Sequence, residues 1–356
     1  MCFCRFTGRF PAFYAVWGGQ PERETPLCNI KLHTACFGVC VDLAALAGIL
    51  LGIKNLFHPE KRTVHALDHV TLRVEQGEFV AYAGANGAGK STTIKLLSGI
   101  LAPSGGTVRV LGLDPQRERI ALMRRAGVLF GQRTELWWDH PVITSYEWKK
   151  RVWDIPQPVY DKNLALVRKL LDLDDILKTF ARELSLGQRM RADLGMLLLH
   201  GPEIIFLDEP TLGLDVLAKR RMIAFLKELN RAEGTTILVT SHDMDDLEEM
   251  ARRIVLLREG RLAYDGNFDG LRTLQDSLGR VCVTTASESA PVLPGLRHIR
   301  SEACLHEYAF DRAETGVHEL LVLLAALPDV RDVEMRKAPI EEVIANLYLN
   351  WRGAAN

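Results

Sequence analysis

A glycine-rich segment that ends in lysine and serine has the residue types needed to hold phosphate. An apolar run at 79–84 ends at Gly84, and a helical pattern opens at Lys90 and Ser91. In such a P-loop the backbone N–H groups surround phosphate oxygens, the lysine reaches the terminal phosphates and the serine hydroxyl can ligate Mg²⁺. The N-terminal dipole of the following helix also favours an anion. The alternative, a glycine-rich turn that binds nothing, is disfavoured because strand, loop, Lys-Ser and helix occur in the required order.

Two carboxylates and a histidine lie at the ends of later apolar runs. Asp208 and Glu209 follow the run at 204–207, and His242 lies 33 residues after Glu209. Phosphoryl transfer depends on charge neutralisation and on a well-placed water molecule, which these side chains can provide. Taken singly, an Asp-Glu pair is often a solvated strand end, and a Ser-His pair is more often a helix cap. Their order after the P-loop favours a catalytic role.

The spacing of two further motifs distinguishes among the enzymes that share a P-loop. Gln132 lies 42 residues after Lys90, and the segment LSLGQ occupies positions 184–188. With these motifs in this order, residues 55–275 resemble the nucleotide-binding subunit of an ABC transporter. The neighbourhood at 131–139 and the C-terminal region resemble the ATPase components of ABC-2-type exporters.

The resemblance implies that ATP and Mg²⁺ are the ligands of the P-loop. Glu209 would act as a general base or orient the attacking water, and His242 would contact the γ-phosphate, so the catalytic residues would be Lys90, Glu209 and His242. The residues that would hold Mg²⁺ are Ser91, Gln132 and Asp208. The residues that would contact ATP are Gly84, Ala85, Asn86, Gly87, Ala88, Gly89, Lys90, Ser91, Thr92, Gln132, Ser185, Gly187, Gln188 and Asp215.

One copy of each motif in the chain implies that two chains form the working unit. In similar proteins the segment corresponding to 184–188 meets the γ-phosphate held by the opposite subunit, so Ser185 and Gly187 would act in trans. Leu186 stands where many relatives have a second glycine. The partners implied are a second ATPase subunit, identical or different, and the permease subunits of an ABC transporter at the cytoplasmic face of the cell membrane. The net charge of −1 gives no global electrostatic reason to expect nucleic acid as a partner.

Alternating apolar runs and helical patterns predict an α/β fold. The resemblance implies a P-loop NTPase cassette with a mainly parallel sheet, an antiparallel β subdomain and a helical subdomain. We expect the ABC ATPase domain at 54–275, its helical subdomain at 134–200, and a small C-terminal α+β domain at 280–356. In that last domain the predicted strands are 281–285, 308–311 and 330–335, and the predicted helices are 318–326 and 340–348.

The first 53 residues form an atypical N-terminal extension. Residues 1–34 show no helical or strand period, as is typical of a poorly ordered segment, whereas the run at 35–53 is apolar apart from Asp42 and predicts a packed or amphipathic helix. Five of the seven cysteines lie in the first forty residues, without the paired spacing of a zinc site. No aromatic residue stands at Lys61, where similar proteins place the side chain that stacks on adenine, so the adenine contact is left unassigned.

Four tryptophans lie within 17 residues of the expected helical subdomain: Trp137, Trp138, Trp148 and Trp153. Such a cluster is more often core packing, although a Trp pair beside a loop is also typical of an exposed docking patch. In similar proteins this segment contacts the membrane subunits.

The leading hypothesis is an ATP-hydrolysing subunit that dimerises around ATP and powers a separate permease for export. The alternative is a soluble ABC-type switch that is not coupled to transport. Such switches usually carry two cassettes or a long coiled-coil insertion, and the sequence shows neither. A non-hydrolysing regulator is disfavoured because Lys90, Glu209 and His242 are all present.

Overall fold

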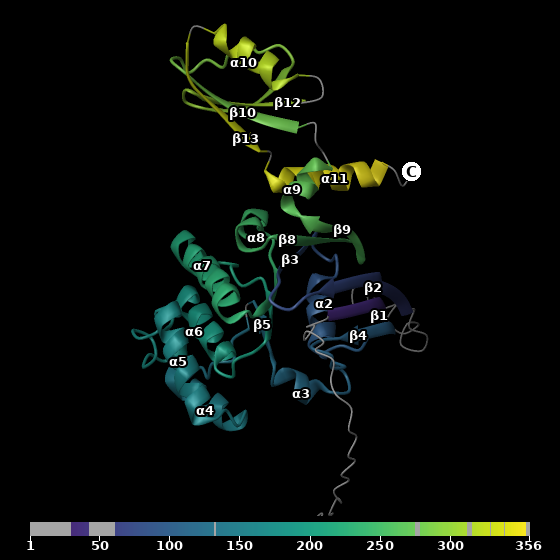
Figure 1. Ribbon diagram of the computed structural model, residues 1–356, viewed down its shortest axis with the longest axis vertical. Helices are drawn as coiled ribbons and strands as arrows, with labels where there is room; N and C mark the ends of the chain where they lie inside the picture. The colour runs from purple at the N-terminus through teal and green to yellow at the C-terminus, as the bar shows by residue number, and fades with distance from the viewer. Residues whose placement is uncertain are drawn as a thin grey trace, which may run out of the picture.

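The computed structural model describes residues 30–42, 61–131, 133–274, 278–311, 315–327, 329–337 and 339–353. The predicted Q-loop residue Gln132 lies outside these ranges, as does most of the predicted N-terminal extension. Figure 1 shows a cassette built around one large sheet, with a smaller sheet standing apart beyond the helices α9 (Phe268–Thr273) and α11 (Ile340–Gly353). No helix in the part of the chain that the structure describes is long and apolar enough to cross a membrane.

The central sheet has six strands in the order β5-β6-β7-β3-β8-β9, all parallel except the last. Its strands are β3 (Phe79–Gly84), β5 (Ala126–Phe130), β6 (Ile204–Asp208), β7 (Thr236–Thr240), β8 (Arg253–Arg258) and β9 (Arg261–Asn267). Every residue of β3 and β7 is buried. Near-continuous apolar runs are typical of parallel strands covered on both faces, and the expected mainly parallel core is confirmed.

The two faces of this sheet carry different layers. One face packs against α2 (Lys90–Leu97) and against a three-stranded antiparallel sheet, with α3 (Arg119–Met123) nearby. The other packs against α6 (Leu186–Leu198), α7 (Val216–Glu233), α8 (Met244–Met250) and α9. In Figure 1 the helices α4 (Val142–Val152), α5 (Gln157–Leu171), α6 and α7 lie on one side of β5, and α2 lies on the other. This arrangement leaves the carboxyl ends of β3, β6 and β7 at one edge, where ligands of open α/β sheets bind.

The antiparallel sheet has the order β2-β1-β4, from β1 (Ile30–Asp42), β2 (Lys61–Val74) and β4 (Gly105–Arg109). The helix predicted to begin at residue 35 is therefore wrong as far as 42, because this segment is a strand that pairs with both β2 and β4. A short apolar run does not distinguish a helix from a buried strand, and here two strand edges supply its backbone partners. Part of the predicted N-terminal extension thus completes the antiparallel sheet of the cassette.

The helical segment comprises α4 (Val142–Val152), α5 (Gln157–Leu171), the 3₁₀ turn η2 (Ala181–Glu183) and α6 (Leu186–Leu198). The buried Tyr146 of α4 donates a hydrogen bond from its hydroxyl to the carbonyl of Ala192 on α6, at 2.6 Å. Gly195 allows this close approach, because a Cβ there would lie 2.2 Å from the Tyr146 hydroxyl. The expected helical subdomain is present in the fold.

The C-terminal region forms a second, four-stranded antiparallel sheet in the order β11-β12-β10-β13. Its elements are β10 (Leu278–Thr285), β11 (Leu296–Glu302), β12 (Leu305–Asp311), α10 (Val317–Ala325) and β13 (Val330–Lys337). Its own core includes Val281, Tyr308, Phe310, Leu320 and Leu324. This α+β unit was expected, although the sequence pattern did not reveal β11.

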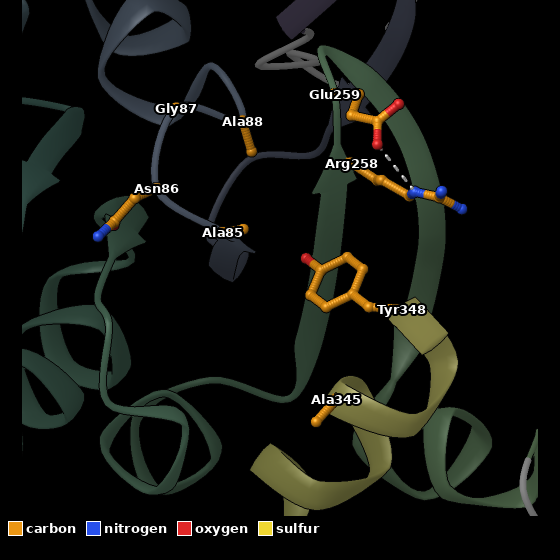
Figure 2. A pocket seen from close by; sticks show the side chains of 8 residues that line it. All are labelled: Ala85, Asn86, Gly87, Ala88, Arg258, Glu259, Ala345 and Tyr348. Carbon is orange, nitrogen blue, oxygen red and sulfur yellow. Dashed lines mark ion pairs between the residues drawn. The ribbon is translucent and has the colours of Figure 1, made fainter. Parts of the chain in front are cut away.

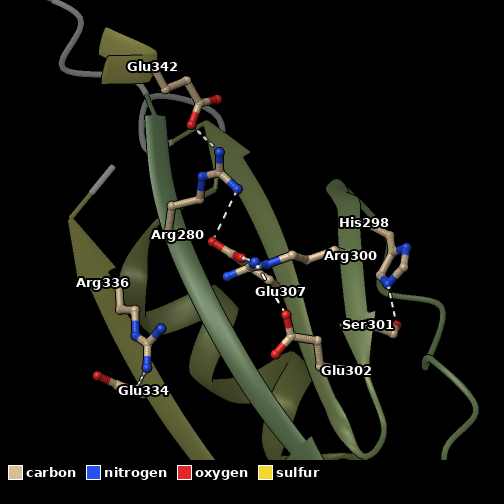
Figure 3. A network of polar contacts seen from close by, with 9 residues as sticks. All are labelled: Arg280, His298, Arg300, Ser301, Glu302, Glu307, Glu334, Arg336 and Glu342. Atoms are coloured by element: carbon tan, nitrogen blue, oxygen red, sulfur yellow. Dashed lines mark hydrogen bonds and ion pairs between the residues drawn. The ribbon is translucent and has the colours of Figure 1, made fainter. Parts of the chain in front are cut away.

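The last helix, α11 (Ile340–Gly353), leaves the small sheet and returns to the cassette. Its buried residues Ile340, Val343, Ile344 and Leu347 join the cassette core. Figure 3 shows how the helix stays tied to the small sheet: Arg280 of β10 bonds to Glu307 of β12 at 3.3 Å and also pairs with Glu342 of α11. The sequence assigned this helix to the small domain, but its apolar face is covered by the cassette.

Candidate functional site

The P-loop between β3 and α2 needs glycine where its backbone turns. Gly87 and Gly89 have φ values of 80° and 107°, in the left-handed region that side chains rarely adopt. A Cβ at Gly89 would also lie 2.5 Å from the carbonyl oxygen of Ala66. The loop therefore adopts a form that only this glycine pattern permits, and it opens directly into α2.

Lys90 is held against the loop that it follows. Its Nζ donates to the carbonyl of Gly84 at 2.7 Å and to that of Ala85 at 3.3 Å. Burial lowers the pKa of Lys90 from its ordinary value, while the nearby carboxylates of Glu209 and Asp208 oppose that change. A phosphate entering the loop would thus meet a largely desolvated cation that is already positioned.

Asp208 and Glu209 are placed by two neighbouring parallel strands. The Thr240 hydroxyl of β7 donates to Asp208 Oδ1 at 2.7 Å, and the Glu209 N–H donates to the Thr240 carbonyl at 3.1 Å. Glu209 has a φ of 57°, a left-handed conformation that is uncommon for a residue with a side chain. The strand ends thus fix both carboxyl groups at the carboxyl edge of the sheet.

His242 lies beside Glu209, although 32 residues separate the two in the chain. Its Nε2 is 2.5 Å from Glu209 Oε1, and the two side chains are 44% and 22% exposed. The pair sits at the surface of the cassette and remains accessible to a ligand. A carboxylate held by an imidazole in this way can orient a water molecule.

A cavity of about 390 Å³ joins these groups to the helix after the P-loop. Its lining includes Ser91, Asp208 and Glu209, together with Gly131 and Arg133, the neighbours of Gln132 in the chain. Hydroxyl and carboxylate oxygens are the ligands that Mg²⁺ prefers, so Ser91 and Asp208 fit a magnesium site. Thr92 follows in the first turn of α2 and is half-buried.

The predicted signature residues form the start of α6. Ser185 is its N-cap: its Oγ accepts from the Gln188 N–H at 3.2 Å, and Gln188 Oε1 accepts from the Ser185 N–H at 2.9 Å. Gly187 lies in the first turn, and the neighbouring Leu186 is 43% exposed. This reciprocal cap leaves the helix N-terminus facing outward, a geometry suited to an anion from another molecule.

Asp215, the predicted D-loop residue, caps α7. Its Oδ1 accepts from the N–H groups of Leu217 and Ala218, both at 2.9 Å. The structure therefore gathers Lys90, Ser91, Asp208, Glu209 and His242 around one edge of the sheet. It places Ser185, Gly187, Gln188 and Asp215 at two helix N-termini, whose hydrogen bonds are local.

Asp193 is a functional candidate that the sequence analysis missed. It lies buried on α6, and its Oδ1 accepts from the Thr134 hydroxyl at 2.8 Å and from the Glu135 N–H at 3.1 Å. Burial raises the pKa of Asp193 to about 6, and these hydrogen bonds oppose the increase. The residue anchors the segment that follows position 132 to the signature helix. The sequence feature that could have revealed Asp193 is a carboxylate within an otherwise apolar stretch of this helix.

The tryptophans divide between packing and exposure. Trp153 is partly buried and contacts His200, with ring centroids 4.7 Å apart and the rings tilted by 41°. Trp137, Trp138 and Trp148 are 38%, 51% and 38% exposed, and the rings of Trp137 and Trp148 lie 5.3 Å apart. We call these three residues the Trp patch. The cluster is therefore divided between one tryptophan that packs on the core and three that are exposed.

Comparison with known sequences gives one family. The family described as ABC transporter matches residues 67–212. The ABC transporter ATP-binding protein NatA of Bacillus subtilis is 30% identical over 215 residues, which cover 60% of this chain and 87% of NatA. A putative ABC transporter ATP-binding protein of Methanosarcina mazei is 33% identical, over 57% of this chain and 70% of its own. ABC transporter A family member 1 of Dictyostelium discoideum is 30% identical over 274 residues, which cover 74% of this chain and 31% of that relative. The chain therefore spans about a third of the length of that relative.

Comparison with solved structures agrees on the fold. An ATP-binding subunit of an ABC transporter superposes with a TM-score of 0.57 at 24% identity, over 69% of this chain and 93% of its own. The ATP-binding cassette MJ0796, solved as a dimer bound to ADP and Pi, gives a TM-score of 0.56 at 23% identity, over 67% and 98% of the two chains. At sequence identities this low, the structural similarity is evidence for the fold alone.

Proposed function

Because the chain belongs to the ABC transporter family and carries its ATP-binding cassette, we propose that it hydrolyses ATP to power a separate membrane permease. The observation that carries the proposal is the convergence of Glu209 and His242, 2.5 Å apart, beside the cavity that Ser91 and Asp208 line. A base or water-orienting carboxylate, a histidine and a cation site beside a P-loop are the parts that phosphoryl transfer requires.

Each residue has a proposed role at this site. The backbone of Gly84 to Thr92 surrounds the phosphates, and Lys90 neutralises their charge. Ser91 and Asp208, with Gln132, hold Mg²⁺, which supplies further charge neutralisation. Glu209 orients or deprotonates the attacking water, and His242 holds Glu209 and contacts the γ-phosphate.

The working unit in this proposal is a dimer. The hydrogen bonds of Ser185 and Gln188 are local, and the α6 N-terminus carries an exposed Leu186 beside it. In Figure 1, α6 lies on the opposite side of β5 from α2, the helix that follows the P-loop. A helix N-terminus in this place serves a phosphate best when that phosphate is held by a second chain. Gly187 and Asp215 would act at the same interface, and the second chain is a copy of this one or a related cassette.

The proposed membrane partner docks at the Trp patch. Trp137 and Trp148 contact each other with their rings tilted by 51° while remaining partly exposed, and the Arg189 guanidinium lies 4.9 Å from the Trp138 ring. Exposed aromatic side chains held by such contacts suit an apolar segment of a partner. The chain would then sit at the cytoplasmic face of the membrane. Export is the direction favoured by the resemblance around 131–139 and in the C-terminal region.

The experiment that tests this function is co-purification from gently solubilised membranes, with mass spectrometry of the bound proteins and an ATPase assay. We expect a polytopic permease to be recovered and Mg²⁺-dependent ATP hydrolysis to be measured. A chain that is absent from membranes and recovers only soluble partners would contradict the transport role and favour a soluble ATP-dependent switch.

Replacing Trp137 and Trp138 together with alanine tests the docking surface. Basal ATPase activity should remain, because neither side chain lines the cavity at Asp208 and Glu209, whereas recovery of the permease should fall. Ile120→Ala is the matched control, since this side chain is 78% exposed on α3, outside the Trp patch. Unchanged permease recovery in the tryptophan variant would refute this docking site.

A further inference from the structure

The C-terminal helix α11 reaches the outer side of the P-loop. A cavity of about 500 Å³ is lined by Ala85 to Ala88 of the loop, by Arg258 at the end of β8 and the following Glu259, and by Ala345 and Tyr348 of α11. Figure 2 shows Tyr348 projecting from α11 toward Ala85, while Asn86 points away from it. A residue more than 250 positions downstream thus contacts the segment that holds phosphate.

The Tyr348 hydroxyl lies between two backbone groups. It donates to the Leu257 carbonyl at 3.1 Å, and the backbone amide of Ala85 lies near enough to lower its pKa. Burial raises the pKa of Tyr348, so the hydroxyl keeps its proton at neutral pH and is able to donate one hydrogen bond and to accept another. The ring bridges the end of β8 and the beginning of the P-loop.

The carbonyl of the same residue is held from within the loop. Ala85 O accepts from the Ala88 N–H at 3.0 Å and from Lys90 Nζ at 3.3 Å. The Tyr348 hydroxyl therefore lies on the N–H side of Ala85, whose carbonyl is held by the loop and its lysine. A shift of Ala85 would displace an acceptor on which Lys90 depends.

We propose that Tyr348 is a positioning residue for ATP binding, which fixes the P-loop through the backbone of Ala85. The C-terminal helix is then a working part of the nucleotide site and a route by which the small domain influences it. The inference rests on the proposed function, because it takes the P-loop to bind ATP. It adds a residue that lies outside all of the ATP-binding motifs.

Tyr348→Phe removes the hydroxyl and keeps the ring that packs on the cassette. The loss of one hydrogen bond to a partly buried backbone group predicts about threefold to tenfold weaker binding of the β,γ-imido analogue of ATP. The kcat at saturating ATP should change less than twofold, because Glu209 and His242 are not displaced. Amide exchange at residues 85–88 should be faster in the nucleotide-free variant.

Tyr264→Phe is the matched control. Tyr264 also packs on the cassette core and donates its hydroxyl to a backbone carbonyl, that of Asn267, at 2.7 Å. It lies on β9, and its hydroxyl bond is confined to the turn into α9. Nucleotide affinity and exchange at 85–88 should match those of the unaltered protein, although a similar hydrogen bond has been removed.

Two outcomes would contradict the inference in distinguishable ways. If Tyr348→Phe binds the analogue within twofold of the unaltered protein and exchange at 85–88 is unchanged, Tyr348 has no positioning role and the proposed function stands. If the unaltered chain itself fails to bind the analogue, the proposed ATPase function is lost, and this inference with it.

Discussion

Glu209 has a φ of 57°, a backbone conformation that costs of order 1–3 kcal/mol for a residue with a side chain. Two hydrogen bonds from its N–H to Thr240, to the carbonyl and the hydroxyl oxygen at 3.1 Å each, hold it there. The position of the carboxylate is therefore determined by the main chain of two strands. A substitution that changes only the charge should leave this geometry in place.

Glu209→Gln should bind ATP with normal affinity and lose nearly all turnover, because an amide cannot accept the proton of the attacking water. Equilibrium binding and steady-state phosphate release measure the two properties separately. Lys90→Ala provides the contrast, since it removes the buried cation and should weaken binding itself. Normal hydrolysis by Glu209→Gln would exclude the proposed role.

Asp193 gives a pH dependence whose direction follows from its raised pKa. The pKa of about 6 lies above the ordinary 3.8, so the protonated carboxyl favours the folded state. That contribution is fully present below about pH 4 and is lost as the pH rises through about 6. Asp193→Asn keeps an acceptor for Thr134 and Glu135 without the charge. Relative to the unaltered protein, its stability should rise by about 2 kcal/mol between pH 4 and pH 7.

Urea unfolding of both proteins across this range measures the difference. A difference that stays constant with pH would show that Asp193 does not titrate in the folded protein. Thr134→Val is a useful companion variant, because it removes one hydrogen bond to Asp193 and should steepen the loss of stability with pH.

The positions of the ATP-binding motifs could be predicted residue by residue, because the order and spacing of these residue types are visible in the sequence alone. Lys90, Ser91, Asp208 and Glu209 each stand at a strand end or loop that local patterns reveal. Asp193 and Tyr348 could not be predicted in the same way. Their partners, Thr134 and Ala85, lie 59 and 263 positions away, and only the packing of α6 and α11 brings them together.

Arg280 joins the small sheet to α11. Its side chain is 8% exposed, and those of its partners Glu307 and Glu342 are 13% and 25% exposed. Because the three groups are mostly buried, removing the cation alone leaves the Glu342 carboxylate with little solvent and without its guanidinium, while Glu307 keeps its bond to Arg300 at 2.8 Å. The small domain and the C-terminal helix should therefore respond together to a change at this position.

Arg280→Met should destabilise this region by about 3 kcal/mol, the cost of breaking a buried ion pair. Hydrogen exchange in β10, β12 and α11 measures the change. Adding Glu342→Gln should recover part of the loss, because the carboxylate that lost its partner is then replaced by a neutral amide. Arg336→Met is the control, since its pair with Glu334 is exposed and should matter little. Equal effects at positions 280 and 336 would contradict this account.

The elements themselves were only partly predictable. Parallel strands such as β3 and β7 were visible as continuous apolar runs because both of their faces are buried. The strand β1 was mistaken for the start of a helix, because its backbone partners come from β2 and β4 and its apolar run fits either form. The strand β11 was overlooked because six of its seven residues are exposed, so it lacks a clear apolar alternation.

At the scale of the whole molecule, the outward-facing α6 N-terminus predicts an ATP-dependent dimer. Glu209→Gln with Mg²⁺-ATP should elute at twice the mass of one chain, because ATP stays bound at the interface. Adding Gly187→Asp should abolish that dimer while each chain still binds ATP, since a carboxylate would then face the partner's phosphate. A Cβ at Gly187 would lie 3.4 Å from Ala218 and is tolerated by the fold.

Light scattering after size exclusion distinguishes these species, with ATP binding measured on the same samples. Dimers that persist in the Glu209→Gln, Gly187→Asp variant would place the contact elsewhere. Dimers that form equally without ATP would show that the nucleotide is not part of the interface.

The return of α11 to the cassette also sets an order of events on the ribosome. Lys90 and Tyr348 are separated by 258 positions, which at ~5–20 residues per second takes roughly 10–50 s to translate. The phosphate-binding loop is thus made early in synthesis and receives its contact from Tyr348 much later. A nascent chain that stalls in this interval carries the ATP-binding motifs with a P-loop that still lacks its outer support.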